Sequence, residues 1–377
     1  MQVGVPKETK THEYRVGLVP ASVRELVHCG HEIKVQKNAG LEVGFSDTVY
    51  QEVGATIVDT AEEIFHWGEL IIKVKEPETP ELHLLLENQI LFTYLHLAAT
   101  PKQTKELINS GCIAIAYETV TDNSGGLPLL APMSEVAGRM SVQVGAHCLE
   151  REQGGAGILL GGVPGVSAAK VVILGGGVVG TNAARMAMGL GASVTVIDKS
   201  LSRLYELDMQ FGATLNTIFA TMEAIDHHVM GADLVIGAVL VPGASAPKLV
   251  SHEIVKNMGL GSVLVDVAID QGGCFETSQP TSHDNPTFIK NGVVHYCVTN
   301  MPGAVARTST QALNNATLPF IMEIANKGYV RAMEENQHLM RGLNIHKGLV
   351  TYEAVANDLS YDYTPPEKVL TRFPKYS

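Results

Sequence analysis

Residues 170–198 contain the feature that most constrains the fold, a β-branched run that leads into a glycine-rich turn. The run KVVIL ends at a G-x-G-x-x-G pattern formed by Gly175, Gly177 and Gly180, and an alanine-rich segment of helical character follows. A second run, SVTVID, then ends at Asp198. Strand, glycine turn, helix and second strand in this order predict a βαβ unit in a parallel, doubly wound α/β sheet.

The three glycines have different roles in such a unit. Gly175 allows the tight turn, Gly177 lets the backbone approach a pyrophosphate, and Gly180 lets the helix pack closely on the strand. The N–H groups and the dipole at the start of the helix favour the charge of a phosphate. We therefore expect a Rossmann domain that binds a dinucleotide; the alternative interpretation is a glycine turn with a purely structural role.

Asp198 predicts which dinucleotide is bound. A carboxylate at the end of the second strand can accept hydrogen bonds from both hydroxyls of the adenosine ribose, and it would repel a 2′-phosphate. This position therefore favours NAD over NADP as the cofactor. Two nearby cations, Lys199 and Arg203, weaken the preference.

The rest of the chain alternates short apolar runs with helical patterns, which is typical of parallel sheets covered by helices. The stretch 120–132, rich in Asn, Ser, Gly and Pro, interrupts the alternation, and after about Thr308 we recognise only helical patterns. A helical tail of that size rarely forms a domain of its own. We expect a substrate and catalytic domain at 1–128, a Rossmann NAD-binding domain at 129–306, and C-terminal helices at 307–377 that return to the first domain. The first domain would then be Rossmann-like and discontinuous in sequence.

Composition disfavours several classes of protein. The 377 residues carry a net charge of −12, and an acidic surface repels the phosphates of nucleic acids. There is no apolar run of about 18 residues to span a membrane, and the N-terminus lacks the apolar core of a signal peptide. The five cysteines are scattered and odd in number, which favours reduced thiols in the cytoplasm over disulfides or a zinc site. The pair His227-His228 is typical of a solvated turn, and we expect no metal site.

Ligands of doubly wound sheets bind beyond the carboxyl ends of the strands. In the second domain, Asp270 follows the run SVLVDVA at such a position. In the first domain, Lys75 ends LIIKVK, His96 ends ILFTYLH, and Arg15 lies in the polar loop after the first strand. Two cations and a histidine suit a small carboxylate substrate. Taken singly, Lys75 and Arg15 could be solvated surface charges. Asp270 could be an ordinary turn aspartate, and His96 a core histidine.

These motifs closely resemble those of the alanine dehydrogenase family over essentially the whole chain. The segments that carry the resemblance are VGVPKETKTHEYRVGLVP, IIKVKEP, LFTYLHLA, APMSEVAGRMSVQVGA, GVPGV, VVILGGGVVG, VAIDQGG and TNMPGAVARTST. The NAD-binding subunits of proton-translocating transhydrogenases share part of this pattern. Eight motifs in register are far more specific than the glycine pattern alone.

The resemblance implies reversible, NAD-dependent oxidative deamination of L-alanine to pyruvate and ammonium. It implies that Arg15 and Lys75 bind the substrate carboxylate. It also implies that His96 is the proton donor and acceptor and that Asp270 is the second catalytic residue; which of the two is the principal base stays open. The implied NAD contacts are Ser134, Gly175, Gly177, Val178, Val179, Gly180, Asp198, Arg203, Val239, Leu240, Val267, Ala268, Ile269, Asp270, Val298, Thr299, Asn300 and Met301.

Two positions depart from the family's pattern. Ala220 stands where a serine is common, so one hydrogen bond on the adenosine side is missing or is replaced by Thr221, and Gln279 stands where some members have an arginine. Family members are typically homohexamers, so the resemblance implies a homohexamer, and the expected partners are small molecules: L-alanine, pyruvate and ammonium. Two other functions stay open: a hydride-transfer subunit of the transhydrogenase type, and a non-catalytic NAD-binding protein.

Overall fold

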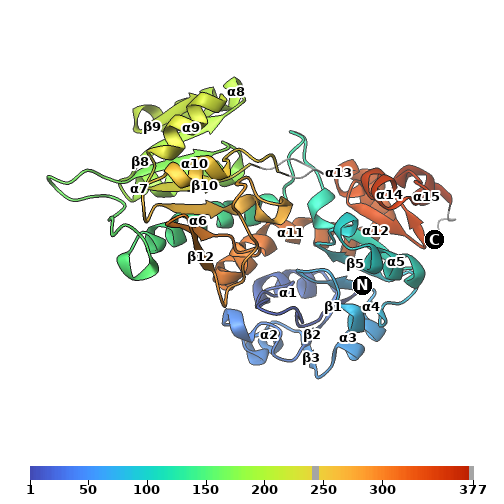
Figure 1. The fold of residues 1–377 in the computed structure, drawn as a ribbon. Coiled ribbons are helices and arrows are strands. Elements are labelled where there is room, and N and C mark those ends of the chain that lie inside the picture. Colours follow the sequence, from blue (N-terminus) through green and yellow to red (C-terminus); the bar gives the residue numbers. More distant parts are fainter. Residues whose placement is uncertain (240–245, 373–377) are drawn as a thin grey trace. The chain divides into compact units, whose positions relative to one another are not determined.

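The computed structural model describes residues 1–239 and 246–372, which form an α/β protein of two compact units (Figure 1). Unit 1 consists of Met1–Pro132 together with Val305–Ser377, and unit 2 consists of Met133–Ala304. Unit 1 is therefore built from two segments that are separated in the sequence by the whole of unit 2.

The sheet of unit 1 has eight strands in the order β15-β14-β6-β5-β4-β1-β2-β3. Strands β1 to β6 are parallel, and their order 3-2-1-4-5-6 is that of a doubly wound sheet. The order reverses between β1 and β4, and ligands of such sheets bind beside that point, at the carboxyl ends. The strands are β1 (Gln2–Val5), β2 (Glu32–Gln36), β3 (Thr56–Val58), β4 (Leu70–Ile72), β5 (Ile90–Thr93), β6 (Ile113–Ala116), β14 (Leu343–His346) and β15 (Leu349–Val350).

The sheet of unit 2 has seven strands in the order β12-β13-β11-β10-β7-β8-β9. All are parallel except the edge strand β12, and the order reverses between β7 and β10. The strands are β7 (Lys170–Leu174), β8 (Ser193–Asp198), β9 (Leu215–Phe219), β10 (Leu234–Gly237), β11 (Val263–Asp266), β12 (Thr287–Lys290) and β13 (Val293–Tyr296). The predicted α/β class with two doubly wound parallel sheets is confirmed, and antiparallel strands are added at the edges.

Helices accompany the strands in both units. In unit 1 they are α1 (Pro20–His28), α2 (Asp47–Glu52), α3 (Ala61–Trp67), α4 (Thr79–Leu82), α5 (Pro101–Ser110), α11 (Ala306–Lys327), α12 (Tyr329–Glu335), α13 (Gln337–Met340), α14 (Glu353–Leu359) and α15 (Pro366–Arg372). In unit 2 they are α7 (Val178–Gly189), α8 (Leu201–Phe211), α9 (Met222–Met230) and α10 (His252–Asn257), and α6 (Ala131–Cys148) begins at the boundary.

The C-terminal segment is not purely helical, and the prediction of helices alone at 307–377 is wrong in this respect. Strand β14 pairs antiparallel with β6, and β15 pairs antiparallel with β14. Lys347 and Gly348 join the two strands, with φ values of 50° and 85°, as a two-residue hairpin turn requires. Strands of four and two residues that include a buried asparagine and a buried histidine carry too little apolar alternation to be recognised in the sequence.

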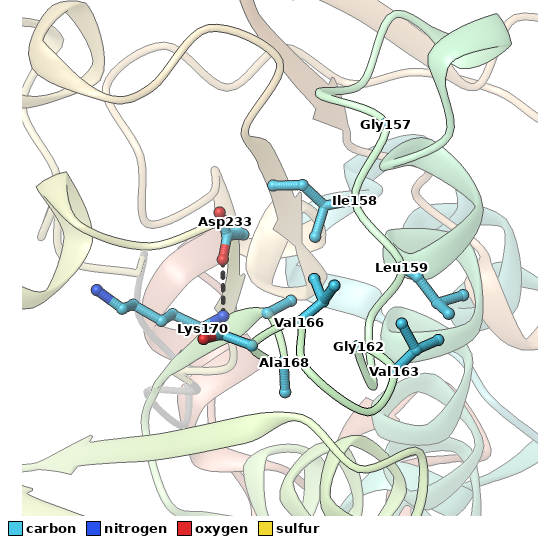
Figure 2. Close-up of a pocket in the computed structure, with 11 residues that line it drawn as sticks. Gly157, Ile158, Leu159, Gly162, Val163, Val166, Ala168, Lys170 and Asp233 are labelled. Atoms are coloured by element: carbon cyan, nitrogen blue, oxygen red, sulfur yellow. Dashed lines mark hydrogen bonds between the residues drawn. The ribbon is translucent and has the colours of Figure 1, made fainter.

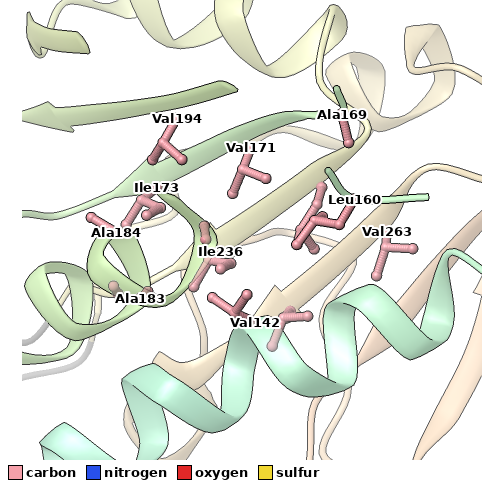
Figure 3. Close-up of a cluster of buried hydrophobic side chains, with 14 of the residues drawn as sticks. Val142, Leu160, Ala169, Val171, Ile173, Ala183, Ala184, Val194, Ile236 and Val263 are labelled. Atoms are coloured by element: carbon pink, nitrogen blue, oxygen red, sulfur yellow. The ribbon is translucent and has the colours of Figure 1, made fainter. Parts of the chain in front are cut away.

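Alternate residues of the central strand β7 enter two different hydrophobic clusters of unit 2. Val171 and Ile173 pack with residues of α6 and α7, whereas Val172 and Leu174 pack with residues of α9 and α10. Figure 3 shows the first cluster, in which small side chains of α7 such as Ala183 lie against the sheet. Burial on both faces explains why these strands appear as continuous apolar runs in the sequence.

A buried lysine joins three segments of unit 1 near the carboxyl end of β4. The side chain of Lys73 is fully buried, and its Nζ lies 2.8 Å from Glu81 Oε1 and 3.3 Å from Glu8 Oε2. Glu81 belongs to α4, and Glu8 to the loop after β1. Burial alone would lower the pKa of Lys73, but the two carboxylates raise it above its usual value, so the ammonium stays charged. The network fixes the loop after β1 against the end of β4.

Lys73→Met should destabilise unit 1, because it leaves two buried carboxylates without their cation. We expect the free energy of unfolding to fall by about 3 kcal/mol or more. The matched control is Lys37→Met, which removes an exposed pair with 3.2 Å between Lys37 Nζ and Asp59 Oδ1 and should change the free energy by less than about 1 kcal/mol. Trp67 is the chain's only tryptophan and lies in α3, so its fluorescence during a urea titration reports unit 1. Equal midpoints for the two variants would contradict this account.

Candidate functional site

The hydrogen-bonded ladder between β4 and β5 continues beyond the carboxyl ends of both strands. Tyr94 N donates to Val74 O at 3.3 Å, and the hydroxyl of Thr93 donates to Lys75 O at 3.0 Å. The backbone that carries Lys75 is thereby fastened to the segment that leads to His96.

The carboxylate of Glu8 also holds the backbone of Lys75. It accepts hydrogen bonds from Val74 N at 2.7 Å and from Lys75 N at 3.3 Å, while it pairs with Lys73. Burial raises the pKa of Glu8 above its usual value despite the neighbouring ammonium of Lys73. One side chain therefore links the loop after β1 to the end of β4, the two elements that carry the predicted cations.

Arg15 lies in the loop after β1 and is almost fully buried, with 2% of its surface exposed. Its Nε and Nη2 donate to the two carboxylate oxygens of Glu13, each at 2.6 Å. Burial disfavours the charge of Glu13, but the hydrogen bonds and the charge of Arg15 hold the pKa of Glu13 below its usual value. The bidentate pair fixes the plane of the guanidinium, the group expected to receive a substrate carboxylate.

His96 follows β5 in a left-handed backbone conformation, with φ 50° and ψ 43°. Glu118 stabilises this turn, because its Oε1 accepts hydrogen bonds from His96 N at 2.6 Å and from Leu95 N at 3.1 Å. The side chain of His96 is 44% exposed, and its Nδ1 lies 3.9 Å from Glu118 Oε1. Left-handed conformations of residues other than glycine are uncommon and cluster at functional sites. His96 is therefore not a core histidine, although the residues beside it are apolar.

Electrostatic interactions and ring contacts show that the predicted residues of unit 1 lie near one another. The charge of Lys75 helps to lower the pKa of Glu13. Burial raises the pKa of Tyr94, and the charge of Arg15 offsets part of that rise. The ring of Tyr94 is nearly parallel to the imidazole of His96, with ring centroids 6.0 Å apart. Unit 1 thus gathers Arg15, Lys75 and His96 at the carboxyl edge of its sheet.

A cavity of about 190 Å³ adjoins the loop after β1 in unit 1. Arg15 and Glu13 line it together with Glu8 and the cations Lys7 and Lys10. Six of its eight lining residues are charged, which suits a small polar ligand better than an apolar one.

The glycine-rich turn of unit 2 has the geometry that its sequence predicts. Gly175 has φ 99°, and a Cβ on Gly180 would lie 1.8 Å from Gly175 O, so α7 and the turn touch through backbone atoms. Around Gly177, by contrast, a Cβ would meet no atom within 4 Å, and no side chain caps α7 there. The start of α7 can therefore receive a phosphate.

Asp198 ends β8 and Arg203 lies in α8, and both hydrogen-bond to the backbone of Gly176 in the turn. Asp198 Oδ2 accepts a hydrogen bond from Gly176 N at 2.6 Å, and Arg203 Nε donates to Gly176 O at 2.6 Å. Arg203 Nη2 also donates to Thr181 Oγ1 at 2.5 Å. The two side chains brace the glycine turn, a structural role that the sequence did not predict.

Helix α6 packs backbone to backbone against the start of α7. A Cβ on Gly138 would lie 2.2 Å from Val179 O. Ser134 lies one turn before Gly138 on the same face of α6. Ser134 therefore stays a predicted cofactor contact, on a helix that packs against the start of α7.

Two further predicted segments follow the carboxyl ends of β10 and β13. Val239 comes after β10, and its Cγ2 would lie 3.2 Å from a Cβ on Gly175, which places it at the glycine turn. Leu240 lies outside the described residues. The segment 298–301 follows β13, and the residues at both of its ends are buried. Both segments therefore lie at the same edge of the sheet as the glycine turn.

Asp270 is carried by a short 3₁₀ turn, Val267–Gln271, directly after β11. Asp266 precedes this turn, is fully buried and accepts a hydrogen bond from Ala268 N at 3.1 Å. Burial raises the pKa of Asp266 although several hydrogen bonds act to lower it. Within the turn Ile269 is buried and Asp270 is exposed, so the turn presents Asp270 at the carboxyl edge.

A cavity of about 430 Å³ in unit 2 lies at the opposite edge of its sheet (Figure 2). Lys170 begins β7 and Asp233 precedes β10; both line the cavity, and Lys170 N donates to Asp233 Oδ2 at 2.7 Å. The exposed side chains of Leu159, Val163 and Val166 also line it. Because it adjoins the amino ends of the strands, this cavity is not the predicted dinucleotide site.

Sequence reasoning missed three charged residues that hold this geometry: Lys73, Glu118 and Asp266. Glu118 contacts His96 across 22 residues of sequence, and no local pattern indicates the pairing. The sequence gives a weak indication for Lys73: in an extended strand it lies on the same face as the predicted site residue Lys75, two residues later. Asp266 resembles any acidic residue at the end of a strand until its burial is known.

Comparison with known proteins identifies the family. Residues 141–353 match the family model described as the alanine dehydrogenase/PNT C-terminal domain, and residues 4–137 match the corresponding N-terminal domain. The chain belongs to the alanine dehydrogenase/PNT family. The alanine dehydrogenase of Halomonas elongata is 58% identical over 363 residues, which cover 96% of this chain and 98% of that protein. The alanine dehydrogenase of Methanococcus maripaludis is 56% identical over 371 residues, which cover 98% of this chain and 100% of that protein.

Solved structures agree with this assignment. A structure of an L-alanine dehydrogenase matches with a TM-score of 0.93 and 52% identity, covering 96% of this chain and 99% of that one. A transhydrogenase from Sinorhizobium meliloti matches with a TM-score of 0.80 over 94% of this chain and 100% of that one; at 23% identity this shows a shared fold alone. The resemblance inferred from the motifs is confirmed.

Within the described part of the chain, no helix is long and apolar enough to cross a membrane.

Gly180→Ala should destabilise unit 2, because the new methyl group would overlap Gly175 O. We expect a loss of about 2–3 kcal/mol in the free energy of unfolding. Gly177→Ala is the matched control: its φ of −65° suits alanine and nothing lies within 4 Å, so the change should stay below about 0.5 kcal/mol. Urea unfolding followed by far-ultraviolet circular dichroism measures both. The explanation fails if the two variants lose the same stability.

Proposed function

We propose that this protein catalyses the reversible oxidative deamination of L-alanine. In this reaction L-alanine, NAD⁺ and water give pyruvate, ammonium, NADH and a proton. The observation that carries the proposal is identity of 54–58% to three alanine dehydrogenases over nearly the full length of both chains. The grouping of Arg15, Lys75 and His96 at one edge of unit 1 supports it.

The residues of unit 2 fit NAD. The open backbone around Gly177 and the uncapped start of α7 suit a pyrophosphate. Asp198 suits the two hydroxyls of the adenosine ribose and disfavours a 2′-phosphate. When bound, NAD supplies the acceptor of the hydride. The residues proposed to hold it are Ser134, Gly175, Gly177, Val178, Val179, Gly180, Asp198, Arg203, Val239, Leu240, Val267, Ala268, Ile269, Asp270, Val298, Thr299, Asn300 and Met301.

Arg15 and Lys75 would hold the carboxylate of alanine. Glu13 orients the guanidinium of Arg15, and Glu8 holds the backbone of Lys75, so both cations are positioned before substrate binds. Arg15 is paired with Glu13, and Lys75 would supply a second cation for the carboxylate. Positioning of this kind can contribute roughly several kcal/mol by removing translational and rotational freedom from the reacting groups.

His96 and Asp270 would move protons. An imidazole exchanges protons near neutral pH, so His96 could accept a proton during deamination and return it to the carbonyl oxygen of pyruvate in the reverse direction. Its backbone is held by Glu118, which limits where the ring can lie. Asp270 would assist the water that adds to the oxidised carbon as ammonia leaves.

The direct test is to incubate the purified protein with NAD or NADP and a panel of small amino acids, and to follow NADH absorbance and ammonium release. We expect L-alanine with NAD to give NADH and ammonium in equal amounts. Tight NADH binding without turnover of any amino acid would contradict the proposal and indicate a non-catalytic NAD-binding protein. Hydride transfer between nicotinamide nucleotides without alanine turnover would indicate a transhydrogenase-type subunit instead.

His96→Ala should lower kcat by about a hundredfold or more, because the proton donor and acceptor is lost, while NADH affinity stays within about twofold. Gly177→Ala should show the opposite pattern, with weaker NADH binding because its methyl group stands where the pyrophosphate approaches. His227→Ala removes an exposed histidine of α9 and is the control for surface effects. Steady-state kinetics and NADH fluorescence titrations measure both quantities. Near-normal deamination by His96→Ala would exclude the assigned role.

We also propose that the protein works in the cytoplasm as a homohexamer of 40.3-kDa chains. All five cysteines are free thiols, which suits a reducing compartment. The side chains of Leu159, Val163 and Val166 are 65%, 53% and 64% exposed, and apolar groups that are this exposed suit contacts between copies. Sedimentation velocity should give a species of six chains, and a monomer at micromolar concentration would contradict the proposal.

A further inference from the structure

The loop that carries Asp270 is held from within by one buried carboxylate. Asp266 accepts hydrogen bonds from Ala268 N at 3.1 Å and from Cys274 N at 3.0 Å, on the two sides of Asp270 in sequence. It also accepts a hydrogen bond from the hydroxyl of Ser278 at 2.5 Å. Asp266 thereby ties the beginning of the loop to its end.

The same loop is held on its carbonyl groups by a cation from another segment. Lys248 Nζ donates to Gly272 O at 2.5 Å, to Gly273 O at 2.9 Å and to Phe275 O at 3.3 Å. An ammonium has three N–H donors, so these three carbonyls use all of them. N–H groups at both ends of the loop thus donate to an anion, and three of its carbonyl groups accept hydrogen bonds from a cation.

Two glycines allow the charged groups to reach the backbone of the loop, and their flexibility also makes these contacts necessary. Gly272 and Gly273 have φ values of 88° and 76°, and a Cβ on Gly273 would lie 2.5 Å from Asp266 Oδ2. The absence of side chains lets the charged groups reach the backbone, but glycine also has the greatest backbone freedom of any residue. The ammonium of Lys248, which donates to three carbonyls, restricts the backbone of these glycines beside Asp270.

Backbone hydrogen bonds hold the far end of the loop and the N–H groups of its glycines: Gly272 N donates to Ile269 O at 2.9 Å, and Gly273 N donates to Ala268 O at 3.0 Å. Leu249 N donates to Cys274 O at 2.8 Å, and Glu276 N donates to Val250 O at 2.9 Å. The carbonyls of the two glycines instead face the ammonium of Lys248. Lys248 therefore constrains the glycine carbonyls that follow Asp270, next to Gln271, whose carbonyl accepts a hydrogen bond from Ala246 N at 2.9 Å.

We propose that Lys248 is a positioning residue for the reaction: through the carbonyls of Gly272 and Gly273 it fixes the turn that presents Asp270. The proposal rests on the proposed function of Asp270, and it adds a residue outside the set expected to touch cofactor or substrate. Lys248 is an exposed residue, whereas Asp266 is fully buried. Removal of the lysine charge should therefore cost little stability, and an effect on rate can be separated from an effect on folding.

The test compares Lys248→Met, Lys248→Arg and the control Lys256→Met in the full-length protein. Lys256 also lies in unit 2, but its exposed ammonium pairs with Glu253 at 3.3 Å within α10 and holds no loop. We expect Lys248→Met to lower kcat per NADH-binding site by about tenfold, because small displacements of a catalytic group cost large factors in rate. NADH affinity should fall by about fivefold through the same turn, since affinity depends on preorganised contacts.

The KM for alanine should stay within about twofold of the wild-type value, because the proposed carboxylate ligands lie in unit 1. Lys248→Arg should recover at least about half of kcat, because it restores charged N–H donors. Lys256→Met should change nothing. If Lys248→Met does not fold, Lys248→Gln provides the same comparison.

The proposal is overturned if kcat per NADH-binding site in Lys248→Met stays within about twofold of wild type, or if Lys256→Met loses as much. It is also overturned if activity falls only in proportion to the fraction of folded protein, which would make the role of Lys248 purely structural. Failure of the proposed function is a different result: the wild-type protein would then not oxidise alanine. In that case NADH affinity of the Lys248 variants still tests whether the ammonium positions the turn.

Discussion

Parallel pairing of the central strands decides where polar side chains can gather in this protein. In both units the central strands follow the order 3-2-1-4-5-6, so all their carboxyl ends lie at one edge and the order reverses once, between β1 and β4 or between β7 and β10. Each side chain singled out for chemistry lies in a segment that begins at such an end. Arg15 follows β1, and Lys75 and His96 follow β4 and β5. In unit 2 the glycine turn follows β7, and Asp270 follows β11.

Gathering charges at one edge requires that each buried charge has a partner. Lys73 has Glu8 and Glu81, Arg15 has Glu13, and Asp266 has backbone N–H groups and a serine hydroxyl. An unpaired charge at any of these positions would cost several kcal/mol. The same pairs set the geometry of the site, because they join its loops to the strand ends. Stability and positioning therefore depend on the same side chains.

The sequence predicted the features whose physics is local. A strand, a glycine turn, a helix and a second strand ending in an acid follow one another within 29 residues, and each part constrains its neighbour. The positions of Arg15, Lys75 and Asp270 at strand ends followed from the same logic. Comparison with alanine dehydrogenases then confirmed the family that the motifs indicated.

Features that depend on distant partners were not predictable. Glu8 holds Val74 across 66 residues, and β14 pairs with β6 across more than half of the chain. The conformation of His96 depends on Glu118, and the histidine could not be distinguished from a core residue before its backbone was seen. Lys248 and Asp266 act on a glycine pair whose neighbours in space, rather than in sequence, decide its conformation.

The central claim is that the hydrogen on the α-carbon of alanine is transferred directly to NAD on this protein. Reaction of L-alanine deuterated at that carbon with NAD, followed by mass spectrometry of the NADH and assay of ammonium and pyruvate, tests it most directly. The account predicts one deuterium in each NADH and equal amounts of NADH, ammonium and pyruvate. NADH without deuterium, or pyruvate formed without NADH, would contradict it.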